Sequence, residues 1–451
     1  MGTDNGTNNG TNNGAVNGTV GLRFASFPAG YDAADHRKAD ERTVRWFDAV
    51  NLGFHEDRSI PERFPAQVDG YLRDGRILTA VYDDDMPEYA WDPAVPVATY
   101  GTMVNDLNVG GRELLPAHLV TAVTVRPTHR RRGILRQMIT SDLARAKAAG
   151  LALAALTASE ATIYGRFGFG AATSTARVEL DTRGGLEFSA PPRGSIAVAD
   201  PDKILALAPE LFRAHLERTF GALGRQHAYA MRAAGKWNGE NTEPDRAVRS
   251  VLRFNAEGVP DGYAAYKSLG WRNEPHTMKV IDLVASSDEA YRELWRYLGS
   301  IDLVDRLTYA EAPVEDPLPW MLADRRRYTV KNIEDVLWLR ILDAPAALAA
   351  RGYFGDGAVV LHVTDPMGLA DGTFLLKVRD GVGTCAPAEP GEDAGTLRAE
   401  LTVAALGSLY LGAVSARTLA AAGGVRAQDD ALSLLDSLFT AGPAPYCSTH
   451  F

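Results

Sequence analysis

The pattern of hydrophobic and polar positions divides the chain into a polar tail and three longer segments. Residues 2–19 carry only two apolar side chains, Ala15 and Val16, in a Gly/Asn/Thr run. Such a composition cannot offset the entropy of ordering, so we predict that residues 1–19 are a disordered tail. Beyond it, apolar runs of strand length alternate with runs of helical period. This alternation predicts an α/β fold, followed by α+β structure from about residue 332.

Within residues 20–190, the most regular pattern lies between residues 119 and 157. A β-branched strand at 119–125 leads into a helix over 133–148, and an apolar strand follows at 151–157. Strand, helix and strand at this spacing are typical of a βαβ unit with parallel strands. The other elements expected in this segment are a helix at 35–51 and strands at 20–27, 71–81 and 97–109.

The second segment, residues 191–331, repeats the strand–helix–strand rhythm without a basic turn. We expect its helices at 201–220, 246–255 and 287–298, and its strands at 262–267, 279–285 and 305–310. For the third segment, residues 332–451, we expect strands at 336–342, 358–364, 372–378 and 397–402, and helices at 404–411 and 429–440. A Pro-containing tail then covers residues 442–451.

Composition narrows the possible functions. The formal net charge of −10 disfavours nucleic acid or an anionic membrane as a partner and favours cationic ones. Only Cys385 and Cys447 are cysteines and the nine histidines are scattered, so we predict no metal site. With no signal peptide and no apolar run of membrane-spanning length, we expect a cytoplasmic protein.

The passage VTAVTVRPTHRRRGILRQMI, residues 120–139, holds the strongest candidate for a binding site. Three arginines and Gly133 open a helix after a strand. Free backbone amides and the positive end of the helix dipole favour an anion there, and Gly133 allows close approach to a pyrophosphate. Neither the P-loop nor the GxGxxG pattern is present. A solvated basic helix start that contacts RNA is the alternative interpretation of this motif.

Nearby residues indicate a cleft at the same end of the βαβ unit. The strand carries Val123-Thr124-Val125, and the next strand runs into TASEATIYGRFGFG, residues 157–170. Tyr164 follows that second strand closely, as either a site residue or a packing tyrosine.

These motifs resemble a known family. VRPTHRRRGILR together with LTASEATIYGRFGFG is similar to the enhanced intracellular survival (Eis) family of aminoglycoside N-acetyltransferases, within the GNAT superfamily. The resemblance spans nearly the whole chain after the tail. It implies two tandem GNAT domains, at 20–190 and 191–331, of which the second lacks a cofactor site. It also implies a sterol-carrier-protein-like domain at 332–451 and a homohexamer.

The resemblance also implies roles for single residues. Acetyl-CoA would be the cosubstrate, Tyr164 the general acid, and the terminal carboxylate of Phe451 the base. One difference is Leu135, where the superfamily usually has Gly or Ala, although Eis-like proteins commonly depart there too. The residues implied to bind acetyl-CoA are Val123, Thr124, Val125, Arg131, Arg132, Gly133, Ile134, Leu135, Arg136, Ser159 and Glu160.

The implied chemistry is coherent. An amine must lose its proton to attack a thioester, and a terminal carboxylate becomes a better base when it is desolvated in a cleft. The amide of Val125, if it is free of the sheet ladder, could stabilise a developing oxyanion, and a tyrosine can protonate a departing thiolate. For Phe451, a frayed chain end is the alternative interpretation.

The acceptor is expected to be a cationic amine such as an aminoglycoside, modified at more than one position. Protein lysine is an alternative acceptor, and a lipid or sterol carrier with relic GNAT domains is an alternative of another class. The candidate acceptor contacts are the carboxylates of Glu56, Asp57 and residues 83–85, the aromatic side chains of Trp46 and Phe54, and His450. The alternative, favoured for the carboxylates and aromatic residues, is that surface turns commonly carry such carboxylates and that helix-spaced aromatic residues are more often core.

Overall fold

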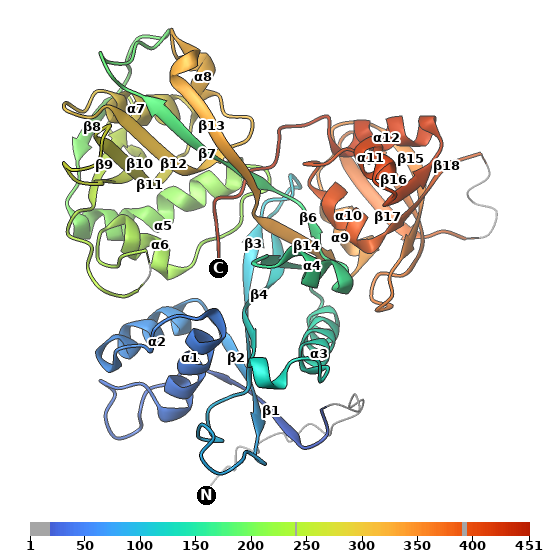
Figure 1. Ribbon diagram of the computed structural model, residues 1–451. Helices are drawn as coiled ribbons and strands as arrows, with labels where there is room; N and C mark the ends of the chain where they lie inside the picture. The colour runs from blue at the N-terminus through green and yellow to red at the C-terminus, as the bar shows by residue number, and fades with distance from the viewer. Residues whose placement is uncertain (1–18, 240, 390–394) are drawn as a thin grey trace, which may run out of the picture.

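The computed structural model describes residues 19–239, 241–389 and 395–451, which form three bodies, each built on one sheet (Figure 1). The predicted tail, apart from Thr19, lies outside the described residues. In the described part of the chain, no helix is long and apolar enough to cross a membrane. Nor do these residues include a group of three or more His, Cys, Asp or Glu side chains that could hold a metal ion.

The first body is a seven-stranded sheet in the order β1-β2-β3-β4-β5-β14-β6. Only β4 and β5 pair in parallel, and α3 connects them. Its strands are β1 (Leu22–Pro28), β2 (Ile77–Asp83), β3 (Ala98–Leu107), β4 (Leu115–Val125), β5 (Leu153–Thr157), β6 (Gly170–Ala171) and β14 (Leu337–Ile341). Its helices are α1 (Glu41–Phe54), α2 (Phe64–Arg73), α3 (Ile134–Ala148) and α4 (Ala161–Tyr164).

The second body repeats this plan in the order β13-β7-β12-β11-β10-β9-β8. Here β11 and β12 form the parallel pair and α7 connects them. Its strands are β7 (Ser174–Asp181), β8 (Ser195–Val198), β9 (Arg249–Phe254), β10 (Pro260–Ser268), β11 (Thr277–Ala285), β12 (Arg306–Pro313) and β13 (Tyr328–Asp335). Its helices are α5 (Pro201–Arg218), α6 (His227–Ala233), α7 (Asp288–Gly299) and α8 (Leu318–Met321).

The third body is a five-stranded sheet in the order β17-β16-β15-β18-β19. One apolar cluster combines its core with residues of the first sheet, so the two bodies are packed together. Its strands are β15 (Gly357–Thr364), β16 (Gly372–Arg379), β17 (Val382–Pro387), β18 (Leu397–Thr402) and β19 (Val425–Ala427). Its helices are α9 (Ala344–Ala350), α10 (Val403–Tyr410), α11 (Ala416–Ala421) and α12 (Asp429–Phe439).

Strand pairing crosses the segment boundaries expected from the sequence. β7, which precedes residue 190, pairs with β12 and β13 of the second sheet. β14, which follows residue 331, inserts between β5 and β6 of the first sheet. Composition along the chain reports where elements begin and end, but it carries no information about these distant partners.

Two expected elements are wrong. Within residues 71–81, the chain completes helix α2 at Arg73, turns at Gly75 with φ of +65°, and starts β2 only at Ile77. The helix predicted at 246–255 is the strand β9, whose Val251 and Leu252 are both buried. A short apolar run buried on two sides has no period that separates a strand from a helix.

Candidate active site

A β-bulge interrupts the regular pairing of β4 with β3 near the end of β4. The register with β3 shifts so that Ala122 and Val123 together oppose Tyr100. Ala122 has a positive φ of 49°, and its carbonyl accepts a hydrogen bond of 2.9 Å from the Thr99 hydroxyl. The same hydroxyl lies 2.6 Å from that of Thr124, so the Thr124 side chain stabilises the bulge.

The pairing between β4 and β5 stops just before the bulge. Their parallel register ends at Val120 opposite Leu156. The last five residues of β4 (residues 121–125, the β4 extension) therefore have no ladder partner on the β5 side. Val123 and Val125, both predicted to bind the cofactor, lie on this extension and are half-buried.

The arginine turn (residues 130–136) follows the β4 extension. After a 3-10 turn over Pro127–His129, Arg131 and Gly133 adopt positive φ angles of 65° and 80°, and α3 begins at Ile134. Gly133 stands at the N-cap position but has no side chain that could accept a hydrogen bond from the helix amides. No acidic residue occupies the first turn. The turn therefore combines an uncapped helix start with arginine side chains, an arrangement that suits an anion.

Asp83, at the end of β2, fixes this turn. Its Oδ2 atom lies 3.1 Å from Nη1 of Arg132 and 3.1 Å from Nε2 of His129. Burial alone would raise the pKa of Asp83, but hydrogen bonds, the one from Arg132 foremost, hold it below its ordinary value. The expectation that Asp83 faces a cationic acceptor is therefore corrected, because Asp83 is already paired with the turn.

Tyr164 lies at the end of α4, close to the β4 extension. Its ring meets that of Phe169 edge-on at 6.2 Å, and it belongs to an apolar cluster whose margin includes Val123, Val125 and Leu135. Burial, with a smaller effect of Glu160, raises the pKa of Tyr164. The phenol therefore stays protonated at neutral pH, as a proton donor requires. Ser159 and Glu160, just before α4, are exposed.

The end of the chain is held in place. Its C-terminal segment (residues 445–451) passes from the third body to the space between the other two (Figure 1). Thr449 is 1% exposed and donates to the carbonyl of Leu223 at 2.9 Å. The Thr157 hydroxyl, at the end of β5, donates to the Phe451 main-chain oxygen at 3.3 Å. This contact places the main chain of Phe451 at the end of β5, the strand next to β4.

A buried cation anchors the C-terminal segment. Arg225 pairs with Asp282 at 2.7 Å and donates to the Ser448 hydroxyl at 3.1 Å. The Tyr229 hydroxyl accepts a 2.6 Å hydrogen bond from the His450 amide. Burial would lower the pKa of Arg225, but Asp282 together with Tyr263 and Tyr229 raises it above its ordinary value, so the guanidinium stays charged. Sequence reasoning quoted Thr157 only as the first residue of the 157–170 run and gave it no role, and it missed Arg225, which belongs to no local motif.

Several predicted acceptor contacts lie elsewhere. Trp46 is 1% exposed and donates to the carbonyl of Thr79 at 2.9 Å, so it belongs to the core and not to an acceptor pocket. Asp84 pairs with Arg23 at 3.1 Å, and the His450 ring lies 3.0 Å from Glu311. Phe54 is 44% exposed at the end of α1, and the neighbouring carboxylates of Glu56 and Asp57 are exposed.

The second body has the same parallel pair but a different helix start. Pairing of β11 with β12 ends at Val280 opposite Tyr309. Only Ser286 and Ser287 then separate β11 from α7, and the Ser287 hydroxyl accepts from the amide of Ala290 at 3.0 Å. Asp288 and Glu289 occupy the first turn. A capped, acidic helix start repels an anion.

Comparison with known proteins defines the class. The description "Acetyltransferase (GNAT) domain" matches residues 36–172 and again residues 221–341. "Sterol carrier protein domain" matches residues 344–448. The chain is therefore an N-acetyltransferase with two tandem GNAT domains and a sterol-carrier-like C-terminal domain, as the resemblance implied. GNAT acetyltransferases use acetyl-CoA.

Relatives narrow the class to a family. An uncharacterized N-acetyltransferase of Streptomyces avermitilis is 36% identical over 92% of this chain and 97% of its own length. N-acetyltransferase Eis of Mycobacterium tuberculosis is 36% identical over 74% of this chain and 80% of its own length. The crystal structure of Eis1 from Mycobacterium abscessus has a TM-score of 0.74 at 29% identity, covering 95% of this chain and all of that one. This chain belongs to the Eis family of N-acetyltransferases.

Proposed function

We propose that this chain transfers the acetyl group of acetyl-CoA to primary amines of cationic small molecules, with aminoglycosides as the acceptor class and more than one position acetylated. The observation that carries the proposal is the contact between Thr157 and the Phe451 carboxyl. It supports the proposal because Thr157 ends β5, the strand next to β4, and α4, which ends at Tyr164, follows shortly after Thr157 in the chain.

The arginine turn fits the diphosphate of acetyl-CoA. The side chains of Arg131, Arg132 and Arg136 supply charged donors, and the amides after Gly133, including those of Ile134 and Leu135, supply neutral ones. The pantetheine arm would lie along the β4 extension, against the backbone of Val123 and Val125. Thr124 would contribute backbone only, because its hydroxyl is engaged with Thr99. Ser159 and Glu160 would border the cofactor from the α4 side.

Acetyl-CoA supplies an acetyl group activated as a thioester. The acceptor nitrogen bonds to the acetyl carbon while the carbon–sulfur bond breaks. In this assignment the Phe451 carboxylate accepts the proton that the amine loses, and the Tyr164 phenol gives its proton to the departing sulfur. The raised pKa of Tyr164 supports the second role, because the phenol holds its proton until it is needed.

The aminoglycoside assignment rests on the family resemblance and on the net charge of −10, which attracts polycations. The homohexamer implied by the same resemblance and the cytoplasmic location expected from the sequence remain predictions.

Two measurements test the proposal. Coenzyme A at about 100 times its dissociation constant should stabilise the fold by roughly 2.7 kcal/mol in a thermal-shift titration. Thiol release should then be followed with amikacin, kanamycin and lysine peptides, and product masses should give the number of acetyl groups. A flat thermal response would favour a lipid carrier. Turnover of lysine peptides alone would move the acceptor to protein lysine.

A further inference from the structure

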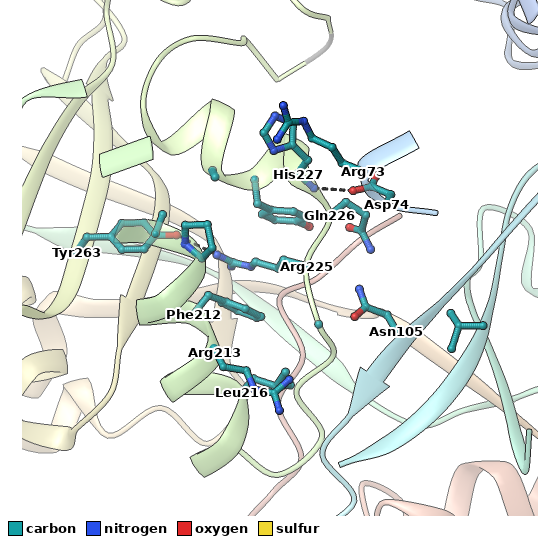
Figure 2. Close-up of a pocket in the computed structure, with 16 residues that line it drawn as sticks. Arg73, Asp74, Asn105, Phe212, Arg213, Leu216, Arg225, Gln226, His227 and Tyr263 are labelled. Carbon is teal, nitrogen blue, oxygen red and sulfur yellow. Dashed lines mark hydrogen bonds between the residues drawn. The ribbon is translucent and has the colours of Figure 1, made fainter. Parts of the chain in front are cut away.

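A cavity lies at the seam between the first and second bodies, next to the C-terminal segment. Its volume is about 480 Å³, within the range of small-molecule sites and far above the roughly 30 Å³ share of one water. α5 forms one wall, the loop before α6 and the end of β3 form the others (Figure 2). Residues that line this seam cavity include Asn105, Phe212, Arg213, Arg225, Gln226 and His227.

Gln226 is the unexplained residue of this cavity. The side chain is 5% exposed, yet neither its amide nitrogen nor its amide oxygen has a hydrogen-bond partner. Figure 2 shows the carboxamides of Gln226 and Asn105 turned toward one another from the two bodies. Buried polar atoms in folded proteins nearly always have partners. A buried carboxamide with two unmet atoms at a cavity therefore points to a ligand group that can both donate and accept.

The charged residues around the seam cavity are already paired. Arg73 is paired with Asp69, Arg213 with Asp106, and Arg225 with Asp282, at N···O distances of 2.8, 2.8 and 2.7 Å. The one lining carboxylate, Asp74, lies 3.1 Å from Arg76 and also accepts from the amide of His227. No unpaired carboxylate is therefore present among these lining residues to receive an ammonium group.

The hydrogen-bonding groups that the seam cavity still offers to a ligand are uncharged, apart from one guanidinium nitrogen. Burial lowers the pKa of His227, so its ring is neutral at pH 7. Nε of Arg225 has no partner and can donate to an oxygen atom, but it repels an ammonium. The rings of Phe212 and Tyr263 and the side chain of Leu216 give the cavity an apolar wall. Carboxamides beside an aromatic wall suit a hydroxylated ring, whose hydroxyls donate and accept and whose faces are apolar.

The seam cavity also adjoins the proposed base. Arg225 contacts Ser448 and Tyr229 contacts His450, so two lining residues hold the segment that ends at Phe451. We propose that the seam cavity is a subsite for an uncharged, hydroxyl-bearing ring of the acceptor, recognised by Gln226, and that an acceptor whose amine reaches the Phe451 carboxyl extends its body into this cavity. This inference rests on the proposed function and adds where the non-reacting part of the acceptor lies.

Replacement of Gln226 by leucine tests the subsite. Q226L keeps the side-chain size and removes both amide atoms. We expect the KM for kanamycin to rise about 10-fold, the loss expected when hydrogen bonds to a ligand are removed. The KM for spermidine, a polyamine without hydroxyls, and the KM for acetyl-CoA should change less than two-fold. The melting temperature without ligand should stay the same or rise, because an unpaired buried amide is removed.

The matched control is Q428L, which makes the same change at an exposed position of the third body. It should leave every constant unchanged. An unaltered KM for kanamycin in Q226L would overturn the subsite, as would equal rises for kanamycin and spermidine. A rise confined to lysine peptides would also overturn it, since the cavity would then recognise amides of a polypeptide.

A direct binding experiment separates this inference from the proposed function. Crystals of the full chain are soaked with methyl α-glucoside, an uncharged ring without an amine. Sugar bound to Gln226 would support the subsite even if wild-type enzyme acetylated no aminoglycoside. An empty seam cavity at saturating sugar would overturn the subsite even if kanamycin were a good acceptor.

Discussion

The two GNAT bodies share a backbone plan and differ at one helix start. In each body a parallel strand pair stops partway, at Val120 opposite Leu156 and at Val280 opposite Tyr309. In each, a register shift follows on the strand before the connecting helix. The scaffold that exposes a strand end next to a helix N-terminus therefore occurs twice in this chain.

The helix starts differ in capping and charge. α3 begins after the uncapped Gly133 with arginines around it, whereas α7 begins after the Ser287 cap with Asp288 and Glu289. Glu289 is further engaged by Arg253. The first start offers free donors and positive charge, while the second has used a donor and carries negative charge.

The C-terminal segment meets both bodies at equivalent places. The Tyr446 hydroxyl donates to the carbonyl of Glu311 on β12, just past the last parallel pair of that strand, and the main-chain oxygen of Phe451 accepts from the Thr157 hydroxyl just past the last parallel pair of β5. A tyrosine side chain thus occupies the strand end in the second body, and the main chain of Phe451 occupies it in the first. The comparison teaches that capping, charge and the residue at the strand end distinguish the two bodies, and the fold does not.

The largest effect is expected from a Gly-Ser extension after Phe451. It removes the carboxylate from Thr157, so turnover should fall about 10²–10⁴-fold, the usual contribution of a positioned proton acceptor. Thiol release measures turnover, and the thermal shift with coenzyme A should be retained. The same dipeptide at the N-terminus is the control. Full activity of the extended enzyme would refute Phe451 as the base.

Y164F should lower kcat about 10²-fold through loss of the proton donor. The dissociation constant for coenzyme A should be unchanged, and Y89F at an exposed position serves as the control. Because burial raises the pKa of Tyr164 above about 10, the wild-type kcat should show no decline from this group up to pH 9. A matching loss of coenzyme A affinity in Y164F would make the residue structural.

Charge removal at the arginine turn should act on cofactor binding. The variant R136A should raise the KM for acetyl-CoA about 10- to 100-fold with little change in kcat, since a charged hydrogen bond contributes about 1.5–3 kcal/mol when made. R325A in the second body removes the same charge elsewhere. Equal rises in the two variants would indicate a diffuse charge effect.

The smallest effect is expected at the second helix start. S287A should lower the free energy of unfolding by about 1 kcal/mol, because the amide of Ala290 loses its acceptor. Chemical denaturation measures this change. Calorimetry should still count one coenzyme A per chain, since Asp288 and Glu289 keep the site acidic. Binding of a second coenzyme A to this variant would show that the Ser287 cap alone prevents cofactor binding in the second body.

Local pattern sufficed for the βαβ unit of the first body. The expected strands at 119–125 and 151–157 and the helix at 133–148 match β4, β5 and α3, because their apolar spacing is set within a few residues. β9 was mistaken for a helix because burial on both of its faces comes from helices far away in sequence. The place of β14 beside β5 was likewise invisible to local pattern.

Some residues of the candidate site could be singled out from the sequence, and others could not. The arginine turn, Tyr164 and Phe451 stand in motifs or at the chain end, and the resemblance singled them out. Asp83 and Arg132 are 49 positions apart, and Thr157 and Phe451 are 294 apart, so only the folded chain brings them together. Gln226 belongs to no motif, and its buried amide without hydrogen-bond partners becomes apparent only when the first and second bodies are assembled around it.

The exchange of β14 has a consequence for how the molecule can be made. β6 pairs with β14 and β14 pairs with β5, so a fragment that stops before Leu337 leaves β5, with its apolar residues 153–156, as an open edge. Open apolar edges invite aggregation. During synthesis, the first GNAT body must therefore wait until most of the polypeptide has left the ribosome, and a cloned N-terminal half should prove insoluble.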